Sequence, residues 1–212
     1  MMYAYFDVPV AFDPVPVGLS PEESVEHIVA RRERAGVAGT TDDTTRQATQ
    51  LHALSRTLRS LGTLFSGVAV GTIDGSYSMA TLQVAASELT YGDSAETAAE
   101  GAMQSVVAAR GAGWTGAVYP LPCGQPAAVV MGRRVYQLSG ADPSAVPFSE
   151  LQAFVPVPDD PSLPRQAMLT VSFSTPAAAH WETYMPLVTG LLRSLTFSAT
   201  PENGDGDGGA GA

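Results

Sequence analysis

The side chains that most often carry out chemistry are few in this sequence, and they stand far apart. The three histidines, His27, His52 and His180, each fall within a predicted helix and match neither a metal-ligand spacing nor a nucleophile-activating motif. Cys123 is the sole cysteine, and it lies between a proline and a glycine with no cationic neighbour in the sequence to favour a reactive thiolate. We therefore predict that the protein is not an enzyme and has no catalytic residue, no metal site and no cofactor.

Glycine-rich and acidic segments give no stronger signal. The segment Gly67–Gly71 lacks the Lys-Ser/Thr pair of a phosphate-binding loop. Asp205 and Asp207 resemble a fragment of a calcium-binding loop, but the bidentate glutamate that completes such a loop is missing. The paired carboxylates elsewhere stand where helix starts or loops are expected, and capping or hydration explains them. No nucleotide or calcium site is predicted.

The composition predicts one acidic domain. The chain has 212 residues, of which 45% are hydrophobic and 15% are charged, so it holds enough apolar side chains for a single core. We predict that residues 1–198 form this domain and that residues 199–212, which are rich in glycine and aspartate, form a disordered tail. A single cysteine cannot form an internal disulfide, which agrees with a reducing compartment.

The charge restricts the partners. The net charge is −10 and every cationic side chain is an arginine. An acidic domain repels nucleic acid and anionic membrane surfaces. No apolar run approaches the roughly 20 residues that cross a bilayer, and residues 1–7 do not resemble a secretory signal. We therefore expect a soluble cytoplasmic protein whose partner is another protein, with neither nucleic-acid binding nor membrane insertion.

Capping residues and hydrophobic spacing predict four helices. Ser20–Glu23 has the order of a capping box, so a helix should begin at residue 21 and end near Gly36. Leucines at helical spacing predict a second helix over 47–61, and an alanine-rich segment predicts a third over 94–110. A wide apolar stripe from Trp181 to Leu195 predicts a terminal helix that covers a sheet.

Alternation of apolar and polar residues predicts strands over 2–10, 64–73, 76–87, 114–121, 127–138, 151–157 and 169–173. The dipeptide Asp74-Gly75 favours a tight hairpin, and a change in the apolar phase predicts a bulge near Ala80. Because most strands follow one another as hairpins, we predict an α+β fold, with an antiparallel β-sheet flanked by helices in an α/β/α sandwich.

The C-terminal strand and helix carry a resemblance to a known superfamily. The segment Leu169–Pro176 leads through Ser-Thr-Pro into Trp181–Tyr184, and the helix ends in Leu191–Phe197. This pattern resembles the Mog1/PsbP-like superfamily, especially its actinobacterial LpqN-like branch, and the likeness extends over 47–89 and the alanine-rich helix. The envelope location of LpqN-like lipoproteins is not carried over, because the sequence shows no signal peptide and no lipid-attachment cysteine.

Known members of that superfamily are mostly binding, assembly or chaperone-like proteins, so the resemblance implies a protein without catalytic residues. A DcrB-like relative acts as an adaptor for secreted effectors, which implies a link to a secretion system. This implication rests on analogy between folds alone.

We interpret the protein as a noncatalytic protein-interaction module, an adaptor or a chaperone-like protein. The candidate interaction surface combines a hairpin with a proline-rich loop and consists of Arg133, Arg134, Tyr136, Phe154, Pro156, Pro158 and Pro161. One alternative is a small-ligand-binding domain, or an enzyme with a site of dispersed residues, in which Trp114, Tyr119, Cys123 and Tyr136 line a pocket. Another is a structural subunit of a larger assembly.

Overall fold

The computed structural model describes residues 3–38, 40–138, 144–158 and 166–199. Its helices are α1 (Pro21–Ala35), α2 (Thr41–Ser60), α3 (Ala95–Arg110) and α4 (Trp181–Ser194), with a short 3₁₀ turn η1 (Ala178–His180) before α4. Its strands are β1 (Tyr3–Tyr5), β2 (Asp13–Pro14), β3 (Thr63–Ile73), β4 (Ser76–Glu88), β5 (Thr115–Pro120), β6 (Pro126–Leu138), β7 (Ser144–Pro156), β8 (Ala167–Thr175) and β9 (Thr196–Ser198).

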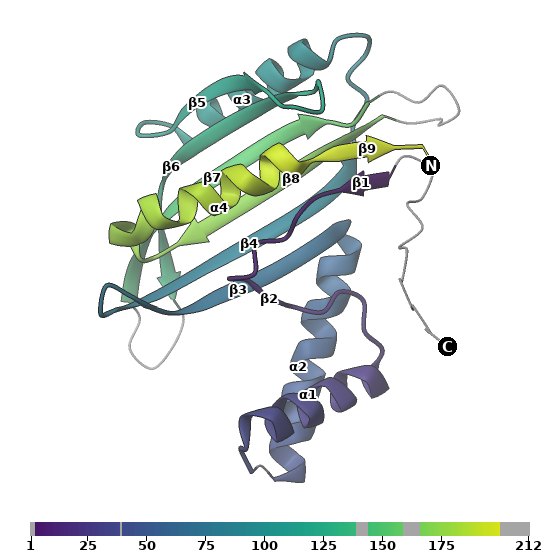
Figure 1. Ribbon diagram of the computed structural model, residues 1–212, viewed down its shortest axis with the longest axis vertical. Coiled ribbons are helices and arrows are strands. Elements are labelled where there is room, and N and C mark those ends of the chain that lie inside the picture. Colours follow the sequence, from purple (N-terminus) through teal and green to yellow (C-terminus); the bar gives the residue numbers. More distant parts are fainter. Residues whose placement is uncertain (1–2, 39, 139–143, 159–165, 200–212) are drawn as a thin grey trace, which may run out of the picture.

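Seven strands form one antiparallel sheet in the order β2-β3-β4-β8-β7-β6-β5 (Figure 1). Strand β8 lies between β4 and β7, so the last long strand of the chain joins the two halves of the sheet. Strand β7 pairs with β8 and β5 pairs with β6, as expected of strands that follow one another as hairpins. Strands β1 and β9 form a separate two-stranded ladder.

The two N-terminal helices show which capping signals can be read from sequence. The Ser20 hydroxyl accepts from the Glu23 amide at 3.1 Å, and the Glu23 carboxylate accepts from the Ser20 amide at 2.7 Å, so the predicted capping box is confirmed. Gly36 ends α1 in a left-handed conformation at φ 64°. Helix α2 begins six residues earlier than predicted, because the Thr40 hydroxyl accepts from the Asp43 amide and caps a polar first turn that hydrophobic spacing does not mark.

The hairpin of β3 and β4 forms at the predicted dipeptide. Asp74 and Gly75 both have positive φ, at 49° and 75°, as a tight turn between two strands requires. The bulge predicted near Ala80 is wrong, since the register is unbroken there and the irregularity of this pair lies near the start of β3. The apparent change of phase arises because Tyr77 is 70% exposed and does not belong to the apolar face of β4.

The strand predicted over residues 2–10 is much shorter than expected. Of residues 3–10, which the structure describes, only Tyr3–Tyr5 form a strand, because the partner β9 has three residues and offers no longer ladder. The chain then turns, with the Phe12 amide donating to the Pro9 carbonyl at 3.0 Å, and the turn places Phe12 in the core.

The main core lies between α4 and one face of the sheet (Figure 1). Phe173 of β8 is at its centre, with ring centroids 5.4 Å from Tyr184, 5.6 Å from Trp181 and 6.5 Å from Phe12. The Tyr184 hydroxyl is not left unpaired in this apolar layer, since it lies 2.7 Å from the hydroxyl of buried Ser78.

Helix α3 packs against β5, β6 and β7 on the other face of the sheet. Ala128 and Val130 of β6 are buried there, and they alternate with Ala127 and Val129, which belong to the core under α4. The predicted α+β fold, an antiparallel sheet flanked by helices, is therefore confirmed. Helices α1 and α2 pack on each other and project from the β3 side of the sheet (Figure 1). Within the described ranges, no helix is both long and apolar enough to cross a membrane.

Candidate functional site

Polar side chains form two rows across the sheet face that lies opposite α4. Residues that pair directly across antiparallel strands share a face, so the pairing register defines each row. From β6 to β3, the first row contains Gly132, Glu150, Ser174, Thr81 and Val68, and the second contains Val130, Gln152, Ser172, Gln83 and Ser66. Helix α3 packs over the β5 to β7 end, while Thr81 is exposed and Gln83, Ser172 and Ser174 are half-buried.

These rows line a shallow hollow of about 180 Å³, which we call the polar groove. Its polar lining consists of Ser66, Thr81, Gln83, Tyr136, Glu150, Gln152, Ser172 and Ser174. The Thr81 and Ser174 hydroxyls lie 2.8 Å apart, and the Gln83 amide donates to the Thr63 hydroxyl at 2.8 Å. The groove therefore presents hydroxyl and amide groups that can both donate and accept hydrogen bonds.

Among the described residues, one charged side chain lines the polar groove, and it is almost completely buried. Glu150 is 4% exposed, and its Oε1 accepts a hydrogen bond from the Tyr136 hydroxyl at 2.5 Å. This bond offsets part of the cost of removing a carboxylate from water. Burial, followed by the hydrogen bond to Glu150, raises the pKa of the Tyr136 phenol above its usual 10.0. Tyr136 therefore stays a neutral donor throughout the physiological pH range.

Two arginines and three aromatic rings stand at the β6 and α3 side of the polar groove. The Arg134 guanidinium carbon lies 4.9 Å from the Tyr136 ring centroid, and that of Arg110 lies 5.0 Å from the Trp114 ring centroid. Phe148 meets Tyr136 edge to face, with ring centroids 5.2 Å apart. We call Arg110, Trp114, Arg134, Tyr136 and Phe148 the Arg–aromatic cluster.

Gly132 allows this cluster to lie flat on the sheet. A Cβ atom at Gly132 would collide with the Trp114 ring, so only glycine lets the indole rest directly on the β6 backbone. Gly132, Arg134 and Tyr136 are alternate residues of β6 and therefore point to the same face. The position of Trp114 thus depends on the glycine two residues before Arg134.

The residues of the candidate surface that we predicted from the sequence do not lie together in the structure. Arg134 and Tyr136 lie together beside the polar groove, whereas Arg133 falls on the opposite face of β6 by strand alternation. Pro156 is fully buried and is the last residue of β7, paired with Met168, so it does not lie in an exposed surface loop as expected.

The rest of that candidate surface adds little to the site. Phe154 and Pro158 are half-buried, and Pro161 lies outside the described residues. The sequence interpretation missed Glu150 and both polar rows. Alternation marked these residues only as the solvent side of strands, and their convergence depends on a strand order that a single sequence does not reveal.

The alternative pocket does not form as predicted. Trp114 and Tyr136 belong to the Arg–aromatic cluster, but Tyr119 is 52% exposed on β5 and Cys123 packs at the margin of the main core. Tyr119, which pairs with Ala127, and Cys123 lie on the α4 side of the sheet, whereas Trp114 and Tyr136 lie on the opposite face, so the four side chains do not meet.

The histidines remain separate. The His52 Nδ1 lies 2.9 Å from the Leu19 carbonyl oxygen, His27 is half-buried on α1, and His180 is buried before α4 with no hydrogen-bond partner for its Nδ1. In the described ranges, no three His, Cys, Asp or Glu side chains lie close enough together to hold a metal ion. That the protein is not an enzyme and takes no cofactor stays a prediction.

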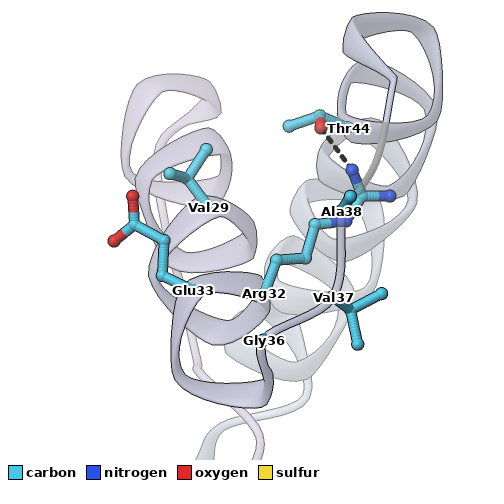
Figure 2. A pocket seen from close by; sticks show the side chains of 7 residues that line it. All are labelled: Val29, Arg32, Glu33, Gly36, Val37, Ala38 and Thr44. Atoms are coloured by element: carbon cyan, nitrogen blue, oxygen red, sulfur yellow. Dashed lines mark hydrogen bonds between the residues drawn. The ribbon is translucent and has the colours of Figure 1, made fainter.

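A second hollow, of about 350 Å³, opens where α1 turns into α2 (Figure 2). Arg32 reaches across it, and its guanidinium donates to the Thr44 hydroxyl at 2.6 Å and to the Gln47 amide oxygen at 3.2 Å. Arg32 therefore joins the two helices across this hollow. We interpret the hollow as part of the helix pair and not as a binding site.

No protein-family model and no curated protein sequence matches this chain. Among solved structures, it is similar to the crystal structure of LpqN, a protein involved in cell envelope biogenesis of Mycobacterium tuberculosis. The identity is 13% and the TM-score is 0.49, over 93% of this chain and 84% of LpqN. Membership of the Mog1/PsbP-like superfamily stays a prediction. Because LpqN takes part in cell envelope biogenesis, the comparison gives no support to the cytoplasmic location expected from the sequence.

Proposed function

We propose that this protein is a noncatalytic protein-interaction module, an adaptor or chaperone-like protein that binds its partner on the sheet face opposite α4. The observation that carries the proposal is the Arg–aromatic cluster beside the polar groove. Tyrosine, tryptophan and arginine are the residues most enriched where protein interfaces concentrate their binding energy. Each ring here is already held by a cation or a second ring, so little conformational entropy is lost when a partner binds.

The shape of the polar groove favours a protein partner over a drug-sized ligand. Small-molecule sites usually enclose about 300–1,000 Å³, and the groove encloses about 180 Å³. Its hydroxyl and amide side chains suit the polar part of an interface, where direct and water-bridged hydrogen bonds surround a few anchoring residues.

Capture from native extract, with two neighbouring arginines compared, tests this proposal. Arg134→Ala removes the cation above Tyr136, whereas Arg133→Ala removes an exposed arginine from the opposite face of β6. We expect the wild type and Arg133→Ala to retain the same partner and Arg134→Ala to lose most of it. A protein that sediments as a monomer in extract, or equal retention by the two variants, contradicts the proposal.

Glu150 favours a second candidate function, the binding of a small polar ligand. A buried carboxylate with a single neutral hydrogen-bond donor has further capacity to accept hydrogen bonds from an incoming hydroxyl or amine. A thermal-shift screen of polyols and amines checks this candidate, because any compound that binds the native state raises Tm. A hit whose shift persists in Glu150→Gln does not bind through this carboxylate.

A further inference from the structure

Strand β3 has an incompletely covered outer edge. On that side, β2 pairs only Asp13 with Val68 and Pro14 with Gly67, and the Val15 amide donates to the Ser66 carbonyl at 2.7 Å. No strand in the described part of the chain lies beside 69–73 on this side. The edge therefore ends in a free stretch of about five residues, close to the length of an ordinary strand.

The direction of the free backbone groups follows from the same register. The hydrogen bond from Val15 to Ser66 shows that the even residues of β3 turn their N–H and C=O groups toward the outer edge. Pro14, which has no N–H, accordingly occupies a position that does not hydrogen-bond to β3. By this alternation, the amides and carbonyls of Val70 and Thr72 point outward, where another strand could pair with them.

The free edge opens into a hollow of about 800 Å³ between β3 and α1. We call it the edge cleft. Its β side is formed by Asp13–Pro16 with Val68 and Val70. Its α1 side is formed by His27, Arg31, Arg34 and Ala35. Figure 1 shows α1 below the β2 and β3 edge of the sheet.

The α1 wall of the edge cleft is basic, although the whole chain is acidic. His27, Arg31 and Arg34 recur at helical spacing and so lie on one side of α1. Arg31 and Arg34 are exposed, and among the described residues of the lining Asp13 is the only carboxylate. In a chain of net charge −10, two arginines opposite residues 69–73, which carry no charge, form a local site for negative charge.

We propose that the edge cleft binds an extended acidic segment of a partner protein, which pairs with β3 at 70–73 and places its carboxylates against Arg31 and Arg34. The inference rests on the proposed function and adds the chemistry of the partner. Main-chain hydrogen bonds to Val70 and Thr72 supply affinity that is independent of sequence. The two arginines, together with the apolar side chain of Val70, then select a segment in which acidic and apolar residues alternate.

The charges disfavour a second copy of the chain as the occupant. Two copies that joined their β3 edges would bring two basic α1 walls together, and each copy has a net charge of −10. Proteins commonly protect such edges with charged side chains or proline. Residues 69–73 contain neither, which fits an edge kept available for pairing.

A designed peptide tests the proposal on the full-length protein. The probe is a fluorescently labelled peptide of alternating glutamate and valine, about six residues long, and its counterpart has lysine in place of glutamate. We expect the glutamate peptide to bind in fluorescence anisotropy and the lysine peptide to bind at least about tenfold more weakly. Binding should also weaken as the salt concentration rises. Equal binding of the two peptides, or no binding of the glutamate peptide, overturns the proposal.

Matched variants locate the binding. The double variant Arg31→Glu with Arg34→Glu should weaken the glutamate peptide about tenfold or more. The control double variant, Arg56→Glu with Arg193→Glu, makes the same change in net charge on exposed residues of α2 and α4 and should leave binding nearly unchanged. If the two double variants weaken binding equally, the attraction is to the whole protein and the edge cleft is not the site.

The strand edge is tested separately at Val70, whose side chain is 61% exposed and tolerates charge without a change in the core. Val70→Glu should abolish binding of the glutamate peptide, whereas Val70→Lys should retain it. Amide hydrogen exchange should slow at Val70 and Thr72 when the peptide binds. Unchanged exchange at both amides overturns strand pairing. A concentration-dependent dimer that Val70→Glu abolishes identifies a second copy as the occupant and also overturns the proposal.

The same variants separate this inference from the proposed function. If the native partner is retained by Val70→Glu but lost by Arg134→Ala, the interaction module stands and the edge cleft is not its contact. If no partner is captured by the wild type, the proposed function fails, whatever the peptide does.

Discussion

The two faces of the seven-stranded sheet are built from alternate residues of the same strands, yet they differ in almost every property. Under α4, Leu82, Val171 and Phe173 are at most 1% exposed and form the main core. On the opposite face, their neighbours Thr81 and Ser172 carry hydroxyls into the polar groove. One face therefore stabilises the fold by burying apolar area, which leaves the other free to carry groups suited to binding.

The largest expected effect lies in the core. Phe173→Ala should lower the free energy of unfolding by about 3–5 kcal/mol, because it removes a buried ring that contacts Phe12, Trp181 and Tyr184 and leaves a cavity. Urea denaturation followed by circular dichroism measures this loss. A loss below about 1 kcal/mol would mean that α4 does not pack tightly on the sheet.

A smaller decrease in the free energy of unfolding is expected at Glu150, the buried carboxylate on the sheet face opposite α4. Tyr136→Phe removes the hydrogen bond to Glu150 and should cost about 1–3 kcal/mol, since the carboxylate remains buried without its donor. A double-mutant cycle with Glu150→Gln measures the coupling between the two side chains. If the effects of the two substitutions simply add, the bond does not hold Glu150 in place.

The raised pKa of Tyr136 makes part of this stability depend on pH. Because the folded pKa lies above the unfolded value of about 10, the contribution is fully present below pH 10 and is lost as the pH rises through the folded pKa. Denaturation midpoints of the wild type and Tyr136→Phe, compared from about pH 8 to 11, should therefore converge at the alkaline end. A constant difference across this range would show that Tyr136 titrates equally in the folded and unfolded states.

The smallest effect is expected within the polar rows. Ser172→Ala should change the free energy of unfolding by less than about 0.5 kcal/mol, because this half-buried residue lies outside the main core. Urea denaturation of Ser172→Ala and Phe173→Ala under the same conditions measures this difference, since the two residues are adjacent on β8. A decrease of more than about 2 kcal/mol in the free energy of unfolding would show that the sheet face opposite α4 stabilises the fold as much as the main core does.

Local signals explain which parts of the fold could be predicted. The capping box at Ser20 and the turn at Asp74-Gly75 each depend on residues within one turn of the chain, so the sequence reveals them directly. The polar first turn of α2 escaped prediction, because Thr40 caps residues that carry no apolar periodicity.

The candidate site depends on pairing over long distances, which explains why it was missed. Glu150 and Ser174 become neighbours because β7 pairs with β8, and Thr81 joins them from β4, 93 residues before Ser174 in the chain. Tyr136 and Arg134 belonged to the surface predicted from the sequence, since they are alternate residues of one strand. That these two residues lie close to the buried Glu150 follows from the pairing of β6 with β7.

Site-specific crosslinking shows whether the native partner contacts the sheet face opposite α4. A photoreactive residue replaces either Thr81, which is exposed on the sheet face opposite α4, or Thr183, which is exposed on α4. If the sheet face opposite α4 is the contact surface, irradiation of native extract should crosslink the partner from position 81 and not from position 183. Crosslinks that form only from position 183, or equally from both positions, would contradict the account.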